Sequence, residues 1–328
     1  MRHRDLGSTA LTVGEIGLGC WQLGGADWGD LDEDTAFATL RAALDAGVDF
    51  LDTADVYGAG RSEELIGNFT SKLADRPFIA TKVGRFAGCG FPDEFTFAGI
   101  RDCTEASLRR LGVEALDLTQ LHCVPTAVLR HGEIFMWLRQ LQEEGKVLRF
   151  GASVESMDEA MLCMQQKGLC SLQIIFNILR QKPIDQVLER ARASRTALIV
   201  RLPLASGLLG GNYTKRTRFG VGDHRTYNRD GQAFNVGETF AGLEFDRGVE
   251  LADALKTYVP DGLSLPQMAI RWILDYPEVT VVIPGARDPA QAHANAMMSL
   301  LPPLPESLHT QLRDFYFAEV AGHIRGPY

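Results

Sequence analysis

The sequence lacks several features that would place it in other broad classes of protein. It has no uninterrupted apolar run of about 18 residues, so we expect no membrane-spanning segment and no membrane partner. Positive charge is not in excess, because 42 acidic residues outnumber 33 basic ones and give a formal net charge of −9. Such a chain has no overall field favouring nucleic acid, and we expect none as a partner. No early apolar run marks a signal peptide, so we expect a cytoplasmic protein.

Cysteine is sparse, and its spacing has the signature of neither a metal site nor a disulfide framework. The chain has six cysteines, without a C-x-x-C pair or a histidine–cysteine cluster. We therefore expect scattered reduced thiols and no metal ion. The chain also lacks a Pro/Gly/Ser-rich linker and short internal repeats, which predicts a single domain over residues 1–328.

What the sequence does contain is an eightfold alternation of short apolar runs and longer segments of helical period. The expected strands are Glu15–Leu18, Phe50–Asp52 and the segments PFIATKV, ALDLTQLH, RFGAS, SLQIIFN, ALIVRLPL and VTVVIPG. The expected helices are Asp34–Ala46, Ser62–Asn68, Phe97–Leu111, Gly132–Glu144, Met157–Lys167, Ile184–Ala193, Phe245–Lys256, Leu265–Asp275 and Pro289–Met297.

Eight β-then-α units predict an α/β fold of the (β/α)8 TIM-barrel type, with parallel strands inside and helices outside. A doubly wound open sheet is the alternative. It is disfavoured because the first glycine-rich turn, GLGCWQLGG, is not followed at once by a helix, as a dinucleotide fingerprint requires. The segment RDLGSTALTV predicts an N-terminal β-hairpin that plugs the bottom of the barrel, and the last residues form a C-terminal extension.

Polar residues stand at the ends of three consecutive predicted strands, where a barrel carries its active site. Asp52, Lys82 and His122 each close an apolar run, and Tyr57 follows the first of them. Taken singly, each has a structural reading: a turn cap, a solvent-facing lysine or a structural histidine. Together they suit protonation of an oxygen that gains charge as a carbonyl is reduced. The lysine is expected to lower the pKa of the phenol.

With these motifs the chain resembles the aldo-keto reductase family over nearly its whole length. The resemblance rests on GLGCWQLGG, FLDTADVYGAGRSEELIG, TKVG, LDLTQLH, FGAS, PLASGLLGG and IPGARDPAQAHANAM. It implies a catalytic tetrad of Asp52, Tyr57, Lys82 and His122, with Tyr57 as general acid and base. It also implies metal-independent use of NADPH or NADH, with the cofactor lying across the barrel mouth.

The resemblance assigns cofactor contacts to the strand ends and to two later segments. These residues are Gly19, Cys20, Trp21, Asp52, Ser153, Gln173, Arg201, Leu202, Pro203, Leu204, Ser206, Gly207, Leu208, Ile283, Gly285, Arg287, Gln291 and Asn295. Ser153 and Gln173 would hold the nicotinamide amide. Arg201 stands where an aromatic residue often stacks on the nicotinamide, and is expected to stack or hydrogen-bond instead. Arg287, beside the start of the last predicted helix, favours NADP(H), with NAD(H) as the alternative.

The substrate is expected to be a small carbonyl compound or alcohol, bound by Trp21, Trp28, Tyr57, Phe86 and His122. For Trp28 and Phe86, ordinary loop packing is an equal alternative. The long segment 205–245 combines an expected phosphate-binding belt at 204–211 with a basic stretch, 214–230, that is either functional or a solvated surface. Two other functions remain open: a cofactor-sensing regulatory subunit with little turnover, and a metal-dependent barrel hydrolase.

Overall fold

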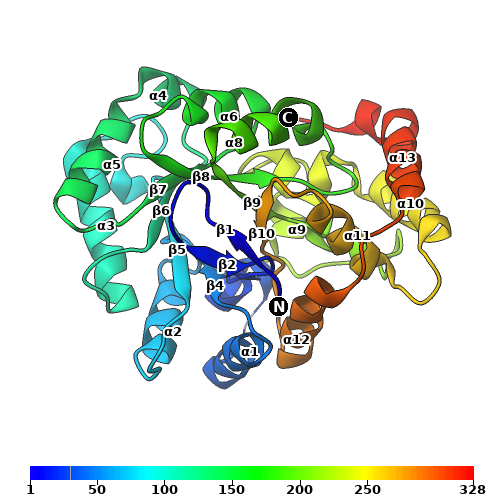
Figure 1. Cartoon of the computed structure of the whole chain (residues 1–328), viewed down its shortest axis with the longest axis horizontal. Coiled ribbons are helices and arrows are strands. Elements are labelled where there is room, and N and C mark those ends of the chain that lie inside the picture. The colour runs from blue at the N-terminus through cyan, green and yellow to red at the C-terminus, as the bar shows by residue number, and fades with distance from the viewer. Residues whose placement is uncertain (30) are drawn as a thin grey trace.

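The structure, a computed structural model, describes residues 1–29 and 31–328 and contains eight parallel strands surrounded by helices (Figure 1). The barrel strands are β3 (Leu18–Gly19), β4 (Phe50–Asp52), β5 (Phe78–Val83), β6 (Leu118–His122), β7 (Phe150–Ser153), β8 (Leu169–Ile175), β9 (Ala197–Arg201) and β10 (Val279–Val282). They pair in chain order from β3 to β10. Parallel bridges Ile16–Val282 and Gly19–Gly285 join the first strand to the last. The barrel is thus closed, and the open-sheet alternative is wrong.

The helices follow the strands much as the periodicity predicts. The long ones are α1 (Glu33–Asp45), α2 (Arg61–Thr70), α3 (Phe97–Leu111), α5 (Glu133–Glu143), α6 (Met157–Met164), α10 (Phe245–Leu255), α11 (Leu265–Leu274), α12 (Pro289–Met297) and α13 (Glu306–Phe315). Their ends have local causes: Thr96 caps α3 by accepting a hydrogen bond from the Gly99 N–H, and Gly112 ends it in the left-handed conformation.

Several predicted boundaries are wrong. The segment expected as one helix at 184–193 is two short ones, α7 (Pro183–Gln186) and α8 (Leu188–Ser194). Helix α6 ends at Met164, three residues before the expected Lys167. Three further helices were not expected. Two of them, α4 (Thr126–His131) and α9 (His224–Tyr227), are too short to show a period, whereas α13 has 10 residues and lies in the C-terminal extension.

The N-terminal hairpin plugs the barrel, as predicted. Its strands β1 (His3–Asp5) and β2 (Thr12–Gly14) pair antiparallel, and Figure 1 shows them in the middle of the ring of strands. Leu6 and Val13 of the hairpin are buried in one cluster with the strand residues Phe50, Leu118 and Ile199. The hairpin therefore completes the inner core, and the functional site is left to the other end of the barrel.

Strand register brings the polar strand ends to a common level. Gly19 pairs with Asp52, Lys82 with Gln120 and His122 with Ser153. Because all eight strands are parallel, these positions meet at one mouth. Among the described residues, no helix combines the length and apolar character needed to cross a bilayer.

The expectation of six free thiols is wrong for one pair. Cys89 and Cys103 form a disulfide across a sequence separation of 14. Within the described part of the chain, Cys20, Cys123, Cys163 and Cys170 are free and buried. The spacing gave no signal, because the fold alone brings the loop after β5 onto α3.

Candidate active site

A cavity of about 530 Å³ opens at the C-terminal ends of the strands. Many residues expected to bind cofactor or substrate line it: Gly19, Trp21, Trp28, Asp52, Tyr57, His122, Gln173, Arg201, Leu202, Pro203, Leu204, Ser206, Gly207, Ile283, Gly285, Arg287 and Gln291. Others do not. Lys82, Cys20, Ser153 and Leu208 are buried behind the cavity wall, and Asn295 holds a turn beside it. Phe86 is outside the lining and 47% exposed, which does not fit a substrate wall.

Lys82 is the centre of the tetrad. Its ammonium Nζ lies 2.5 Å from Asp52 Oδ1, 2.8 Å from the Thr53 carbonyl oxygen and 3.1 Å from Tyr57 Oη. An ammonium has three N–H donors, and these contacts use all of them. Tyr57 Oη therefore accepts from Lys82, which leaves the hydroxyl's own hydrogen free to be donated into the cavity.

The protonation of the tetrad follows from its burial. Burial raises the pKa of the Tyr57 phenol above its usual value, and it outweighs the nearby Lys82 charge, which alone would lower it. The lysine thus acts in the expected direction, but burial is the larger effect and the pKa of the phenol is raised overall. Burial alone would lower the pKa of Lys82, but the Asp52 charge and the Tyr57 phenol raise it overall. At neutral pH the site holds an ammonium beside a neutral phenol.

His122 is a neutral side chain at the same mouth. Burial, and then the charges of Arg85, Lys82 and Arg201, lower its pKa well below the usual range. Its ring stands edge-on to the Tyr57 ring, with centroids 5.8 Å apart. Its buried Nδ1 has no hydrogen-bond partner among residues 1–29 and 31–328. A neutral imidazole retains one N–H donor, as hydrogen bonding to a substrate oxygen requires.

Asp52 is fixed by more than its lysine. Its Oδ2 accepts from Gln173 Nε2 at 2.7 Å, and from Gln120 Nε2 at 3.5 Å. Gln173 Oε1 in turn accepts from Ser153 Oγ at 3.3 Å. The pair expected to hold a nicotinamide amide thus forms a relay that orients Asp52, although Gln173 still lines the cavity.

Arg201 belongs to a buried ionic network. Its Nη1 lies 3.3 Å from Glu238 Oε2, and Arg85 Nη1 lies 3.0 Å from Glu238 Oε1. Burial would raise the pKa of Glu238, but the two guanidinium groups lower it to about 2. Burial, followed by the charge of Glu238, raises the pKa of neighbouring Glu155 to about 7. Arg85 and Glu238 line the cavity but were missed by sequence reasoning.

This network bears on metal binding. Cys123, Glu155 and Glu238 offer ligand atoms within 4.8 Å of one another. The guanidinium groups of Arg85 and Arg201 already pair with Glu238, so they would repel a metal cation bound there. The cluster is therefore a poor cation site.

Aromatic side chains form the wall over Tyr57. The Trp21 ring is stacked on the Tyr57 ring, with centroids 5.7 Å apart, and Trp28 meets Trp21 edge-on at 5.5 Å. Asp27 holds this wall to the long loop after β9: it accepts from Trp21 Nε1 at 2.9 Å and from the Tyr227 hydroxyl at 2.6 Å. Asp27 and Tyr227 also line the cavity and carried no recognisable sequence signal.

The glycine-rich segment after β9 turns sharply beside the cavity. Ser206 and Gly207 both have left-handed backbone, with φ of 54° and 97°. The Tyr213 hydroxyl donates to the Ser206 carbonyl at 3.3 Å and accepts from Arg225 Nη1 at 2.7 Å. Arg225 is buried and lines the cavity, so the basic stretch 214–230 is not wholly a solvated surface.

The turn before α12 is stabilised from within. Asp288 accepts a hydrogen bond from the Gln291 N–H at 2.8 Å, and Gln291 Oε1 accepts one from the Arg287 N–H at 3.1 Å. Asn295 Nδ2 donates to the Gly285 carbonyl at 3.1 Å. Asp288 thus occupies one of the N–H donors at the start of α12 that were expected to bind an anion. The Arg287 side chain is exposed and lines the cavity.

A closed eight-stranded parallel barrel with this cavity and polar set has its site where (β/α)8-barrel enzymes carry theirs, at the C-terminal ends of the strands. The aldo/keto reductase family profile matches residues 15–316, and the chain belongs to this family. The aldo-keto reductase YhdN of Bacillus subtilis is 30% identical over 301 residues, covering 90% of this chain and 87% of the relative.

Two further comparisons cover nearly the whole chain. The NADH-specific methylglyoxal reductase of Escherichia coli is 27% identical over 315 residues, covering 90% of this chain and 92% of the relative. The solved structure of the glycerol dehydrogenase AKR11B4 from Gluconobacter oxydans matches with a TM-score of 0.75 and 26% identity, over 99% of this chain and 97% of that one.

Proposed function

We propose that this protein transfers a hydride between a nicotinamide cofactor and the carbonyl carbon of a small aldehyde or ketone, or the corresponding alcohol. Tyr57 is the general acid for reduction and the general base for oxidation. One observation carries the assignment: the three donors of Lys82 are all used, on Asp52, Thr53 and Tyr57, so the phenolic hydrogen is left for the cavity.

The residues around the cavity fit a nicotinamide dinucleotide. The same cavity is lined by Tyr57 and His122, from the ends of the early strands, and by Arg287, from the turn before α12. Arg201 Nε is buried at the cavity and has no hydrogen-bond partner in the described part of the chain, so it offers a donor to the ligand. Bound there, a reduced nicotinamide supplies the hydride, and the left-handed turn at Ser206 and Gly207 offers backbone to the phosphates.

The chain's own groups manage the proton. Tyr57 donates its hydroxyl hydrogen to the substrate oxygen as negative charge develops there. The Lys82 ammonium, held by Asp52, then stabilises the phenolate. Neutral His122 donates its N–H to the same oxygen and orients it, while Trp21 and Trp28 limit access of water to the reacting centre.

NADP(H) is the proposed cofactor, with NAD(H) the alternative. The exposed guanidinium of Arg287 supports this proposal, because a 2′-phosphate is recognised by arginine donors. The carboxylate of Asp288 reduces the expected preference for NADP(H) over NAD(H), because its negative charge at the start of α12 repels a 2′-phosphate. The name of the NADH-specific relative shows that NAD(H) use occurs among proteins similar to this chain.

The substrate is proposed to be small and polar. The cavity near Tyr57 combines the rings of Trp21 and Trp28 with the charged groups of Asp27, Arg85 and Glu238. This mixture suits a carbonyl compound or alcohol that also carries hydroxyl or other polar groups.

The experiment that tests the proposal is a screen of pooled aldehydes, ketones and alcohols with NADPH, NADH, NADP⁺ and NAD⁺, read as nicotinamide absorbance. We expect turnover of at least one pool with an NADP(H) or NAD(H) cofactor. Cofactor binding without turnover of any pool would contradict the proposal and favour the regulatory subunit.

A further inference from the structure

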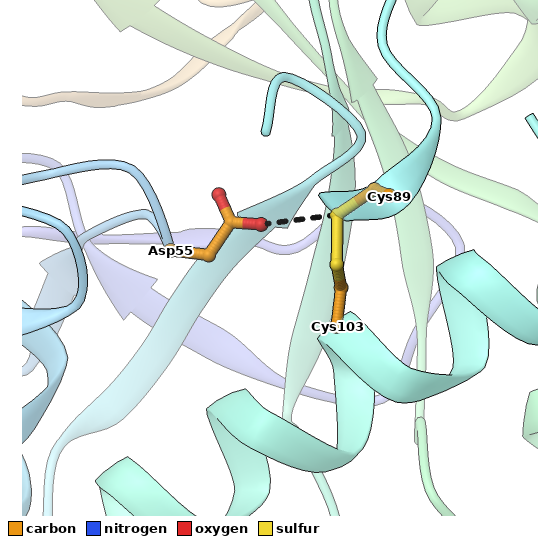
Figure 2. A group of neighbouring side chains, drawn as sticks. All are labelled: Asp55, Cys89 and Cys103. Carbon is orange, nitrogen blue, oxygen red and sulfur yellow. Dashed lines mark hydrogen bonds between the residues drawn. A yellow bond between two sulfur atoms is a disulfide. The ribbon is translucent and has the colours of Figure 1, made fainter. Parts of the chain in front are cut away.

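Three segments that are separate in sequence meet beside the active site around one disulfide. Cys89 ends a short 3₁₀ helix, Ala87–Cys89, in the loop after β5, and its partner Cys103 lies on α3. Asp55 comes from the loop after β4. Figure 2 shows its carboxyl group pointing at the Cys89 sulfur. The three ligand atoms lie within 4.8 Å of one another.

The Asp55 carboxyl group is poorly satisfied while the disulfide is intact. Asp55 is 6% exposed, and its buried Oδ1 has no hydrogen-bond partner among residues 1–29 and 31–328. Oδ2 lies 3.8 Å from Cys89 Sγ, but a disulfide sulfur has no hydrogen to donate. Burial raises the pKa of Asp55 to about 7, and the Glu63 charge adds to the effect. A buried carboxyl in this setting lacks the partner that would offset its desolvation.

The spacing of the three groups resembles one face of a tetrahedral metal site. Zinc binds thiolate sulfur at about 2.3 Å and carboxylate oxygen at about 2.0–2.2 Å, which places neighbouring ligand atoms about 3.5–3.8 Å apart. The distance between Asp55 Oδ2 and Cys89 Sγ is already 3.8 Å. The Cα atoms of Cys89 and Cys103 are 6.0 Å apart, so their sulfur atoms can reach such a separation by side-chain rotation once the disulfide is broken.

We infer that reduction of the Cys89–Cys103 disulfide creates a site for a thiophilic divalent cation such as Zn²⁺, with both thiolates and the Asp55 carboxylate as ligands. Water completes the tetrahedron. The charge of the bound ion offsets the desolvation of the carboxyl group, whose buried Oδ1 has no hydrogen-bond partner in the described part of the chain.

The steps balance with a dithiol as the reductant. The dithiol gives two electrons and two protons to the disulfide, forming two protein thiols, and is itself oxidised to a disulfide. Zn²⁺ then displaces the two thiol protons, and any proton on the carboxyl, into solvent. The oxidation state of the zinc ion does not change. The complex has a net charge of −1, and the neighbouring Arg110 is already paired with Glu63.

The site has an entry route and a connection to the cavity. Cys103 is partly exposed on α3, whereas Cys89 is fully buried, so a reductant and an ion approach from the α3 side. Asp55 lies two residues before Tyr57, and Arg85 lies four residues before Cys89. An ion here would tie together the two loops that carry these cavity-lining side chains.

The test uses the full-length protein, reduced with a dithiol and then freed of reductant without oxygen. Co²⁺ is the probe, because thiolate ligation gives it intense near-ultraviolet charge-transfer absorption, and Zn²⁺ is then added in competition. We expect one equivalent of Co²⁺ per reduced chain, displaced by Zn²⁺, and none with the untreated disulfide form. Equal binding by both forms, or no charge-transfer absorption after reduction, would overturn the inference.

Variants separate this site from the other thiols. Cys103→Ser should abolish the charge-transfer band of the 1:1 complex, and Asp55→Asn should weaken binding at least ~10-fold, since even changes to outer-shell partners cost ~10–100-fold. Cys163→Ser is the matched control, because Cys163 is also a helical cysteine but is buried on α6. An unchanged spectrum with Cys103→Ser, or its loss with Cys163→Ser, would contradict the assignment. Because cobalt absorption is independent of hydride transfer, failure of the proposed function would leave this result unaffected.

Discussion

Replacing Tyr57 by phenylalanine removes a single oxygen atom from the cavity. We expect kcat for carbonyl reduction to fall by at least ~100-fold, the usual scale of general acid–base catalysis. That loss corresponds to roughly 2.7 kcal/mol of transition-state stabilisation, at about 1.36 kcal/mol per factor of ten. The Kd of the cofactor should change little, because the assigned phosphate and adenosine contacts come from other segments. Stopped-flow turnover and cofactor fluorescence titration measure the two quantities separately.

The variant must also be shown to fold. Without the phenolic oxygen, Lys82 loses the acceptor that lies 3.1 Å from its Nζ. A buried donor left without a partner costs about 1–3 kcal/mol, which urea unfolding detects directly. A folded variant with low turnover separates a catalytic defect from a structural one.

Tyr227→Phe is the matched control. Tyr227 lines the same cavity, and its hydroxyl donates to Asp27 at 2.6 Å, far in sequence from the tetrad. Because its hydroxyl takes no part in the proposed proton transfer, we expect its kcat to fall by less than ~10-fold, well under the scale of acid–base catalysis. If Tyr57→Phe behaved like Tyr227→Phe, Tyr57 would not be the acid.

Four other outcomes are expected. Reduction needs the neutral phenol, and burial holds the pKa of Tyr57 above its usual 10.0. The value of kcat/KM for reduction should therefore stay constant through neutral pH and fall only at alkaline pH, where kcat/KM for oxidation should rise. A fall of kcat/KM for reduction between pH ~6 and ~8 would contradict this. Lys82→Met should lower kcat as severely as Tyr57→Phe. It should also destabilise the fold by about 3–5 kcal/mol, because it leaves Asp52 buried and unpaired. Intact activity and stability would argue against the ion pair. Arg287→Ala should lower the ratio of kcat/KM for NADPH over NADH, and an unchanged ratio would refute the proposed phosphate contact. Chelators should leave the disulfide form fully active, and a loss restored by zinc would overturn the proposed mechanism.

The barrel could be predicted because its pattern is local. Each strand–helix unit shows its own period, so helices such as Phe97–Leu111 and Pro289–Met297 agree to the residue. The positions of Asp52, Lys82 and His122 follow from one rule, that strand ends meet at one mouth. Their convergence around Tyr57 therefore needed only the order of the strands.

The rest of the site depends on contacts between distant segments, which no local pattern reveals. Glu238 reaches Arg85 and Arg201 only because a long loop folds back over the mouth. Desolvation of Tyr57 outweighs the expected lowering of its pKa by Lys82, and a sequence contains no measure of burial. The exposure of Phe86 was hidden for the same reason.

The hairpin at the barrel bottom has a consequence for the order in which the chain assembles during synthesis. Leu6 leaves the ribosome long before Val281 and Ile283, which belong to the same buried cluster. The bridge between Ile16 and Val282 likewise waits for the last strand. Such long-range closure is slow, and the apolar hairpin residues Leu6 and Val13 lack part of their cluster until it happens. We therefore expect nascent chains that stop before β10 to depend on chaperones.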